Sequence, residues 1–97
     1  MTRTEAVEAL RAAFPAMTWE CATLEGRILG EYRSAGFILV CVDMASETAW
    51  RAKVDGRIGT SNTHRDPAAA TRGAFTKARK LIARELATLD AARRGGR

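Results

Sequence analysis

The residues of this chain that could carry chemistry are few and far apart. There is one histidine, His64, in a polar stretch beside Arg65. A general base needs a group that orients it and a nucleophile or substrate within reach. No Gly-x-Ser-x-Gly elbow and no cysteine–histidine arrangement supplies these groups. We therefore expect His64 to be a solvated loop residue, and we assign no catalytic residue.

The same scarcity argues against a metal ion or a cofactor. One histidine and two widely spaced cysteines do not have the spacing of a zinc site. No Gly-x-Gly-x-x-Gly sequence or P-loop is present, so nucleotide binding has no support. Glu20, Glu25 and Glu31 could bring two carboxylates together, as a hydrolase requires, but their spacing favours solvated surface acids. We expect a non-enzymatic protein that needs no metal and no cofactor.

The two cysteines, Cys21 and Cys41, each have apolar neighbours, which predicts two buried, reduced thiols. A disulfide would need an oxidising compartment, and the segment Met1–Glu5 has no apolar signal region. The longest apolar run, Phe37–Val42, has the length of a strand and is too short to span a bilayer. These features predict a cytoplasmic protein with no membrane partner.

Positive charge is concentrated at the C-terminal end. Residues 1–34 have a formal net charge of −1, whereas residues 65–97 hold nine basic and three acidic side chains, a net charge of +6. A basic helix face of this kind can neutralise phosphates or meet an acidic protein, but it is also what a solvated helix presents. The candidate macromolecule-binding residues are Arg72, Lys77, Arg79, Lys80 and Arg84.

The elements that would position these residues follow from hydrophobic periodicity. Thr2-x-x-Glu5 predicts a capping box for a helix from about Arg3 to Phe14, which Pro15 ends. Gly30 marks a bulge or a close approach. Strands are predicted over residues 17–21, 27–33, 37–42, 50–54 and 57–60, with Asp55-Gly56 as a hairpin turn.

A second, longer helix is predicted to begin at Asp66-Pro67, with aspartate as N-cap and proline at the first helical position. Its apolar residues recur at spacings of three and four, and we expect Phe75, Ile82 and Leu86 to pack on the sheet. The central run 37–42 does not alternate, which predicts a strand covered on both faces.

These elements predict one α+β domain over residues 1–92 and a flexible basic tail over 93–97. The domain is a two-layer α-β-β-β-β-α fold in which both helices pack on one face of an antiparallel sheet of four or five strands. A homodimer is compatible with so small a core.

The order of elements and the basic last helix resemble the double-stranded RNA-binding domain. That resemblance implies phosphate contacts from the start of the last helix. Here the matching segment, Arg65–Arg72, has no lysine cluster, the Gly-Pro-x-His loop is missing, and the strand at Trp19 is additional.

The Asp-Pro-x-x-Ala opening of an alanine-rich helix over Asp66–Ala78 looks like small phage and prophage proteins. This second resemblance implies an accessory protein that binds a host or phage macromolecule. Our leading hypothesis is a binding module that acts by protein–protein contact. The alternative is duplex RNA or DNA binding through the basic face of the second helix.

Overall fold

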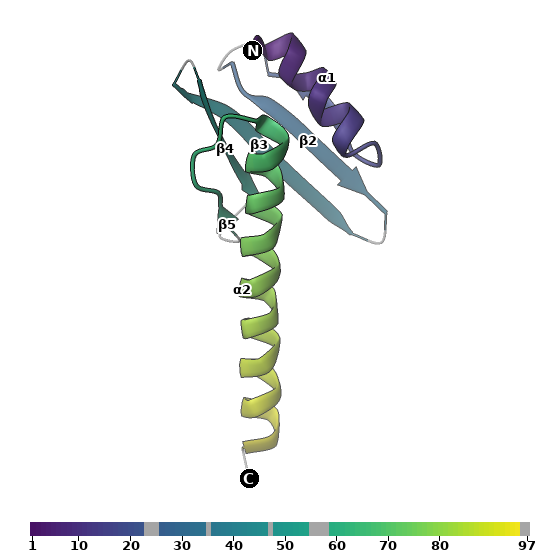
Figure 1. Cartoon of the computed structure of the whole chain (residues 1–97). Helices are drawn as coiled ribbons and strands as arrows, with labels where there is room; N and C mark the ends of the chain where they lie inside the picture. Colours follow the sequence, from purple (N-terminus) through teal and green to yellow (C-terminus); the bar gives the residue numbers. More distant parts are fainter. Residues whose placement is uncertain (23–25, 35, 47, 55–58, 96–97) are drawn as a thin grey trace.

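Five strands form one antiparallel sheet in the order β1-β2-β3-β4-β5, and two helices pack on it (Figure 1). The computed structural model of the chain describes residues 1–22, 26–34, 36–46, 48–54 and 59–95. The α+β class and the element order are confirmed. The elements are α1 (Arg3–Ala13), β1 (Thr18–Cys21), β2 (Ile28–Arg33), β3 (Phe37–Ser46), β4 (Ala49–Val54), β5 (Gly59–Thr60) and α2 (Pro67–Gly95).

Helix α1 begins at the predicted capping box. The backbone N–H of Glu5 donates to the Thr2 hydroxyl at 3.1 Å, and the backbone N–H of Thr2 donates to the Glu5 carboxylate at 2.8 Å. The hydrogen bonds from the Thr2 backbone and then from its side chain lower the pKa of the Glu5 carboxyl. The helix ends at its C-cap, Phe14, just before Pro15. It buries Ala6, Val7 and Leu10 against the sheet.

The core lies between the two helices and one face of the sheet. Trp19, Gly30, Val40 and Val54 follow one another across the strands in register, and all four are buried. At Gly30 the expected close approach is found and there is no register shift between β1 and β2. A Cβ added there would lie 2.4 Å from the Trp19 ring, so the absent side chain makes room for the indole.

The sheet is covered on one face only, so the prediction that residues 37–42 are covered on both faces is wrong. Successive side chains of a strand point to opposite faces. Val40 and Val42 are fully buried, while the alternate residues Leu39 and Cys41 are half-buried and Phe37 is exposed. No element of the described chain packs over this second face, which we call the open face.

Strand β3 extends further than predicted. It includes Ala45 and Ser46, which were expected in a loop, and a register shift between Met44 and Ser46 breaks its pairing with β4. A fifth strand is present at Gly59–Thr60. The predicted Asp55-Gly56 turn and residues 57–58 lie outside the described residues.

Helix α2 begins at the predicted position, because the Asp66 carboxylate accepts a hydrogen bond from the backbone N–H of Ala68 at 3.0 Å. Its first half packs through small residues, with Ala70, Ala74 and Ala78 buried in the core. The helix then continues to Gly95, so residues 93–95 of the expected flexible tail are helical. No helix among the described residues has the length and apolar composition needed to cross a membrane.

Replacing Gly30 with alanine should destabilise the domain, because the new methyl group would overlap the buried Trp19 ring. Overpacking of this kind costs roughly 1–3 kcal/mol, and we expect a lower midpoint of urea unfolding followed by Trp fluorescence. Gly36→Ala is the matched control, since a Cβ at that position meets nothing within 4 Å. Equal midpoints for the two variants would contradict the close packing of Trp19 on Gly30.

Candidate functional site

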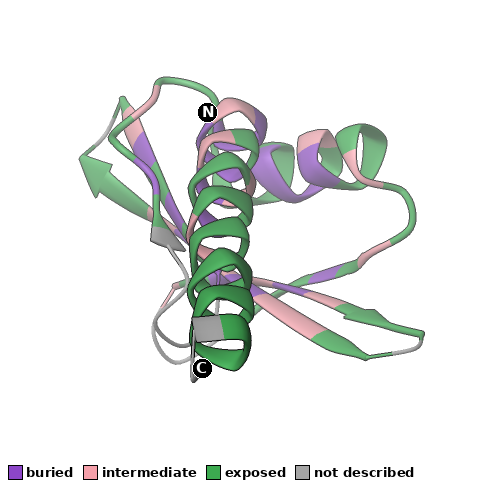
Figure 2. Cartoon of the chain, turned by 90° about the horizontal axis from the view of Figure 1, so that it is seen from below, coloured by how far each residue is buried: buried purple, intermediate pink, exposed green. Residues whose placement is uncertain are grey.

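The second half of helix α2 extends beyond the sheet (Figure 1). The molecule measures 56 × 27 × 24 Å along its principal axes, and α2 accounts for the long dimension. Residues 82–94 of the helix are all exposed, as the view along the helix also indicates (Figure 2). No other helix or strand among the described residues covers this extension, residues 82–95.

Three large apolar residues, Ile82, Leu86 and Leu89, form an apolar stripe along the extension. Their exposed fractions are 43%, 56% and 65%. The expected burial of Ile82 and Leu86 against the sheet is therefore wrong. Phe75, two turns before Ile82 on nearly the same side, is half-buried and its ring centre lies 5.8 Å from that of Phe14, the C-cap of α1. The apolar stripe lies on the same side of α2 as Phe75, but beyond the point where α1 and the sheet end.

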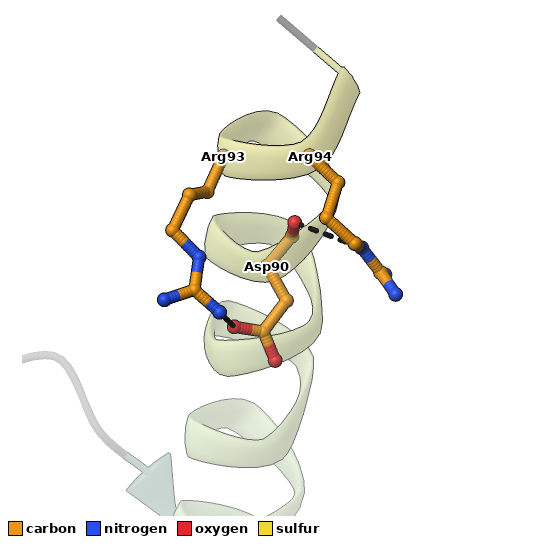
Figure 3. Close-up of polar contacts among 3 residues, drawn as sticks. All are labelled: Asp90, Arg93 and Arg94. Atoms are coloured by element: carbon orange, nitrogen blue, oxygen red, sulfur yellow. Dashed lines mark hydrogen bonds and ion pairs between the residues drawn. The ribbon is translucent and has the colours of Figure 1, made fainter. Parts of the chain in front are cut away.

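Both acidic residues of α2 lie in the extension. Asp90 is engaged locally: its carboxylate lies 3.5 Å from an Arg93 Nη atom, and its backbone carbonyl accepts a hydrogen bond from Arg94 Nε at 3.2 Å (Figure 3). Against Glu85 and Asp90 the whole helix carries seven basic side chains. Four of these seven precede the extension, which itself holds Arg84, Arg93 and Arg94 against the two acids, a small excess of positive charge.

The structure divides the five predicted basic residues between two sides of α2. Arg72 lies over the Phe14 ring, with its guanidinium carbon 5.9 Å from the ring centre, and Arg79 follows it by seven residues on nearly the same side. These two residues face the α1 side of the helix.

The other three residues, Lys77, Lys80 and Arg84, lie on the β5 side, and we call them the basic row. Lys77 donates a hydrogen bond to the Asn62 side chain at 3.3 Å, in the segment after β5. With Thr60 and Leu81, all three line an open hollow of about 300 Å³. At 3.6 residues per turn, Lys77 and Arg72 point roughly 140° apart around the helix.

Two further basic residues, Arg51 and Lys53, were not among the predicted site residues. They lie on the open face of β4 and line a second hollow of about 490 Å³, together with Arg27, Asp43 and Thr60. The strand alternation of residues 50–54 already directed both side chains outward. Their nearness to α2 could not be read from that alternation, because it depends on how the helix lies beside β5.

Of the residues considered for catalysis, Glu20 and Glu31 lie on the open face of the neighbouring strands β1 and β2, as diagonal neighbours in the sheet register, whereas His64 follows β5 at the other end of the sheet. His64 is half-buried and pairs through its backbone with Trp50, and its ring lies beside Gly73 of α2. Glu31 lies 3.6 Å from Arg33, and Glu25 lies outside the described residues. Among the residues that the structure describes, no three His, Cys, Asp or Glu side chains could hold a metal ion.

The prediction of two buried thiols is wrong, because Cys21 is exposed and Cys41 is only half-buried. Cys21 pairs with Ile28, which pairs with Val42, so Cys21 shares the covered face with Val42. Cys41 therefore points to the open face. The two sulfur atoms lie on opposite sides of the sheet and cannot form a disulfide with each other in this fold.

Comparison with protein-family models, curated protein sequences and solved structures gave no match to the chain. The resemblances to the double-stranded RNA-binding domain and to phage accessory proteins therefore stay predictions.

Because the apolar stripe is largely exposed and no other element of the described chain covers it, truncating it should leave folding almost unchanged. We expect Leu86→Ala to change the free energy of unfolding by about 0.5 kcal/mol or less, as for other exposed sites. Leu10→Ala, at a fully buried leucine, should cost roughly 2–5 kcal/mol. Urea unfolding of both variants checks this difference. A large loss of stability in Leu86→Ala would mean that the stripe is part of the core.

Proposed function

We propose that this domain is a non-enzymatic binding module that acts by protein–protein contact through the extension of α2. The observation that supports the proposal is the apolar stripe of Ile82, Leu86 and Leu89, exposed along two turns of helix that nothing in the described chain covers. A short helix in water is marginally stable, and most helix stability in proteins comes from packing an amphipathic face. A partner that covers the stripe would supply this packing.

The occupant that fits the stripe is an amphipathic helix of a partner protein. Ile82, Leu86 and Leu89 recur at spacings of four and three, which is the pattern by which one helix packs against another. The extension is long enough for about four helical turns of contact. An interface of this size is small, and we therefore expect a transient complex.

The charge near the stripe indicates what kind of helix the partner would present. Arg79 and Arg93, seven residues before and after Leu86, lie on nearly its side of α2, which favours a partner with glutamate or aspartate opposite the two ends of the stripe. Charges that face each other across paired helices set partner choice, and Asp90 beside the stripe is already paired with Arg93. The formal net charge of +5 for the whole chain would also steer an acidic partner toward it.

A second copy of this chain fits the stripe less well. In a parallel pair Arg79 and Arg93, which share the side of Leu86, would each face their own copy. In an antiparallel pair that places Leu86 opposite Leu86, Arg79 would face Arg93 of the other copy. Both arrangements set like charges against each other, which is unfavourable. The charge pattern thus favours an acidic partner over self-association.

The proposal is tested with a synthetic helical peptide that has leucine at the a and d heptad positions and glutamate at each end of the leucine stripe, where it would face Arg79 and Arg93. Binding is measured by fluorescence anisotropy against the full chain. The double variant L86Q/L89Q should weaken binding by about 1.4 kcal/mol or more, which is at least about tenfold, because two apolar contacts are lost.

The matched control is A87Q/A91Q, which places glutamine at two exposed positions on the other side of the extension. It should bind as the unmodified chain does. A peptide with lysine in place of glutamate should bind more weakly. Equal binding of both peptides, or a dimer of the chain alone that L86Q/L89Q dissociates, would overturn the acidic partner, the second outcome in favour of a second copy.

A further inference from the structure

Two basic hollows meet at the edge of the sheet, on a different surface from the apolar stripe. The first lies on the open face and is lined by Arg51 and Lys53, and the second lies beside α2 and is lined by the basic row. Thr60 of β5 lines both hollows, and it pairs directly with Lys53 in the sheet register. The two groups of cations therefore adjoin across one narrow strand.

Almost all the charged side chains on this edge are positive, and few of them help to hold the fold together. Asp43, which pairs with Arg51 in register, is the one acid among the described residues that line the two hollows. Within the described chain, no hydrogen bond or ion pair engages the side chains of Arg51, Lys53, Lys80 or Arg84. Their charge is available to a ligand without the loss of an internal contact.

The spacing of these cations matches an extended polyanion better than a single phosphate. Lys77 and Arg84 are seven residues apart, about 10 Å along the helix axis, which corresponds to about three phosphates of one duplex strand. Arg51 and Lys53 extend the surface beyond β5 onto the sheet. Together they present five cations along one edge of the domain.

The chemistry of the lining favours a duplex over a single strand. Single-stranded nucleic acid is usually held by aromatic side chains on which bases stack. Among the described residues that line the two hollows there is no aromatic side chain, and Trp19 and Trp50 are buried in the core. Such a surface can contact phosphates but offers no platform for exposed bases.

We infer that the edge formed by β5, Arg51, Lys53 and the basic row binds the phosphate backbone of duplex nucleic acid. This site goes beyond the proposed protein contact and does not depend on it, because it shares no residue with the apolar stripe. It also differs from a site on the basic helix face alone: it includes two residues of the sheet and excludes Arg72 and Arg79.

The test measures binding of a fluorescent DNA duplex, and of the RNA duplex of the same sequence, to the full chain over a range of salt concentrations. Log K should fall linearly with log[salt], since each phosphate contact releases counterions. For R51Q/K53Q the slope on DNA should become shallower by about 2, and for K77Q/K80Q/R84Q by about 3.

The matched control is R72Q/R79Q, which removes the same charge as R51Q/K53Q from the α1 side of α2. It should leave the slope unchanged and the affinity within about twofold, because neither residue lies at the proposed site. Thermal unfolding confirms that each variant is folded. If R72Q/R79Q reduces the slope as much as R51Q/K53Q, only the net charge matters and the site is wrong.

Two other outcomes would also overturn the inference. One is the absence of duplex binding at low salt. The other is a clear preference for single-stranded over duplex DNA of the same length, which would require base stacking that this surface does not provide. Neither outcome bears on the protein contact, because L86Q/L89Q and the acidic peptide report on that surface separately.

Discussion

The packing of Trp19 on Gly30 is the contact on which the rest of this structure depends. The indole ring occupies the space that a side chain at Gly30 would fill, and its Nε1–H donates a hydrogen bond to the Phe14 carbonyl at 3.2 Å. The Phe14 ring then lies 6.0 Å from Trp19 and 5.8 Å from Phe75 of α2. One buried aromatic residue on β1 thus links the sheet, α1 and the first half of α2.

This linkage sets the rotation of α2 about its own axis, and the rotation decides which residues reach solvent. With Phe75 held against Phe14 and Ala74 in the core, Lys77 and Arg84 must face the β5 side, whereas Arg72 must face α1. The same rotation directs the apolar stripe along the side of Phe75. A basic face that looks continuous on a helical wheel is therefore divided in the folded domain by the elements that α2 contacts.

The small residues and the length of α2 explain why its first half packs on the sheet and its second half does not. Ala70, Ala74 and Ala78 let the helix lie close to the sheet, but the strands are short and α2 is 29 residues long. The helix therefore passes the edge of the sheet near Ile82, and the large apolar residues fall on the part that has nothing beneath it. Leaving such residues in water stabilises nothing within the domain, so the extension and the open sheet face are the surfaces where partners are expected.

The sequence by itself determined the local structure. The Thr2–Glu5 capping box, Pro15, the alternation of residues 50–54 and the Asp66-Pro67 start each depend on hydrogen bonds or periodicity within a few residues, and each is found. Only the tertiary structure decided how much of each apolar pattern is buried. The apolar pattern predicted that the run 37–42 is buried on both faces and that Ile82 and Leu86 belong to the core. Both predictions are wrong, because periodicity shows that a residue is apolar without showing whether another element lies above it. The nearness of Arg51 and Lys53 to the basic row likewise depends on where α2 passes β5. Contacts between elements distant in the chain set that crossing, and no local pattern encodes it.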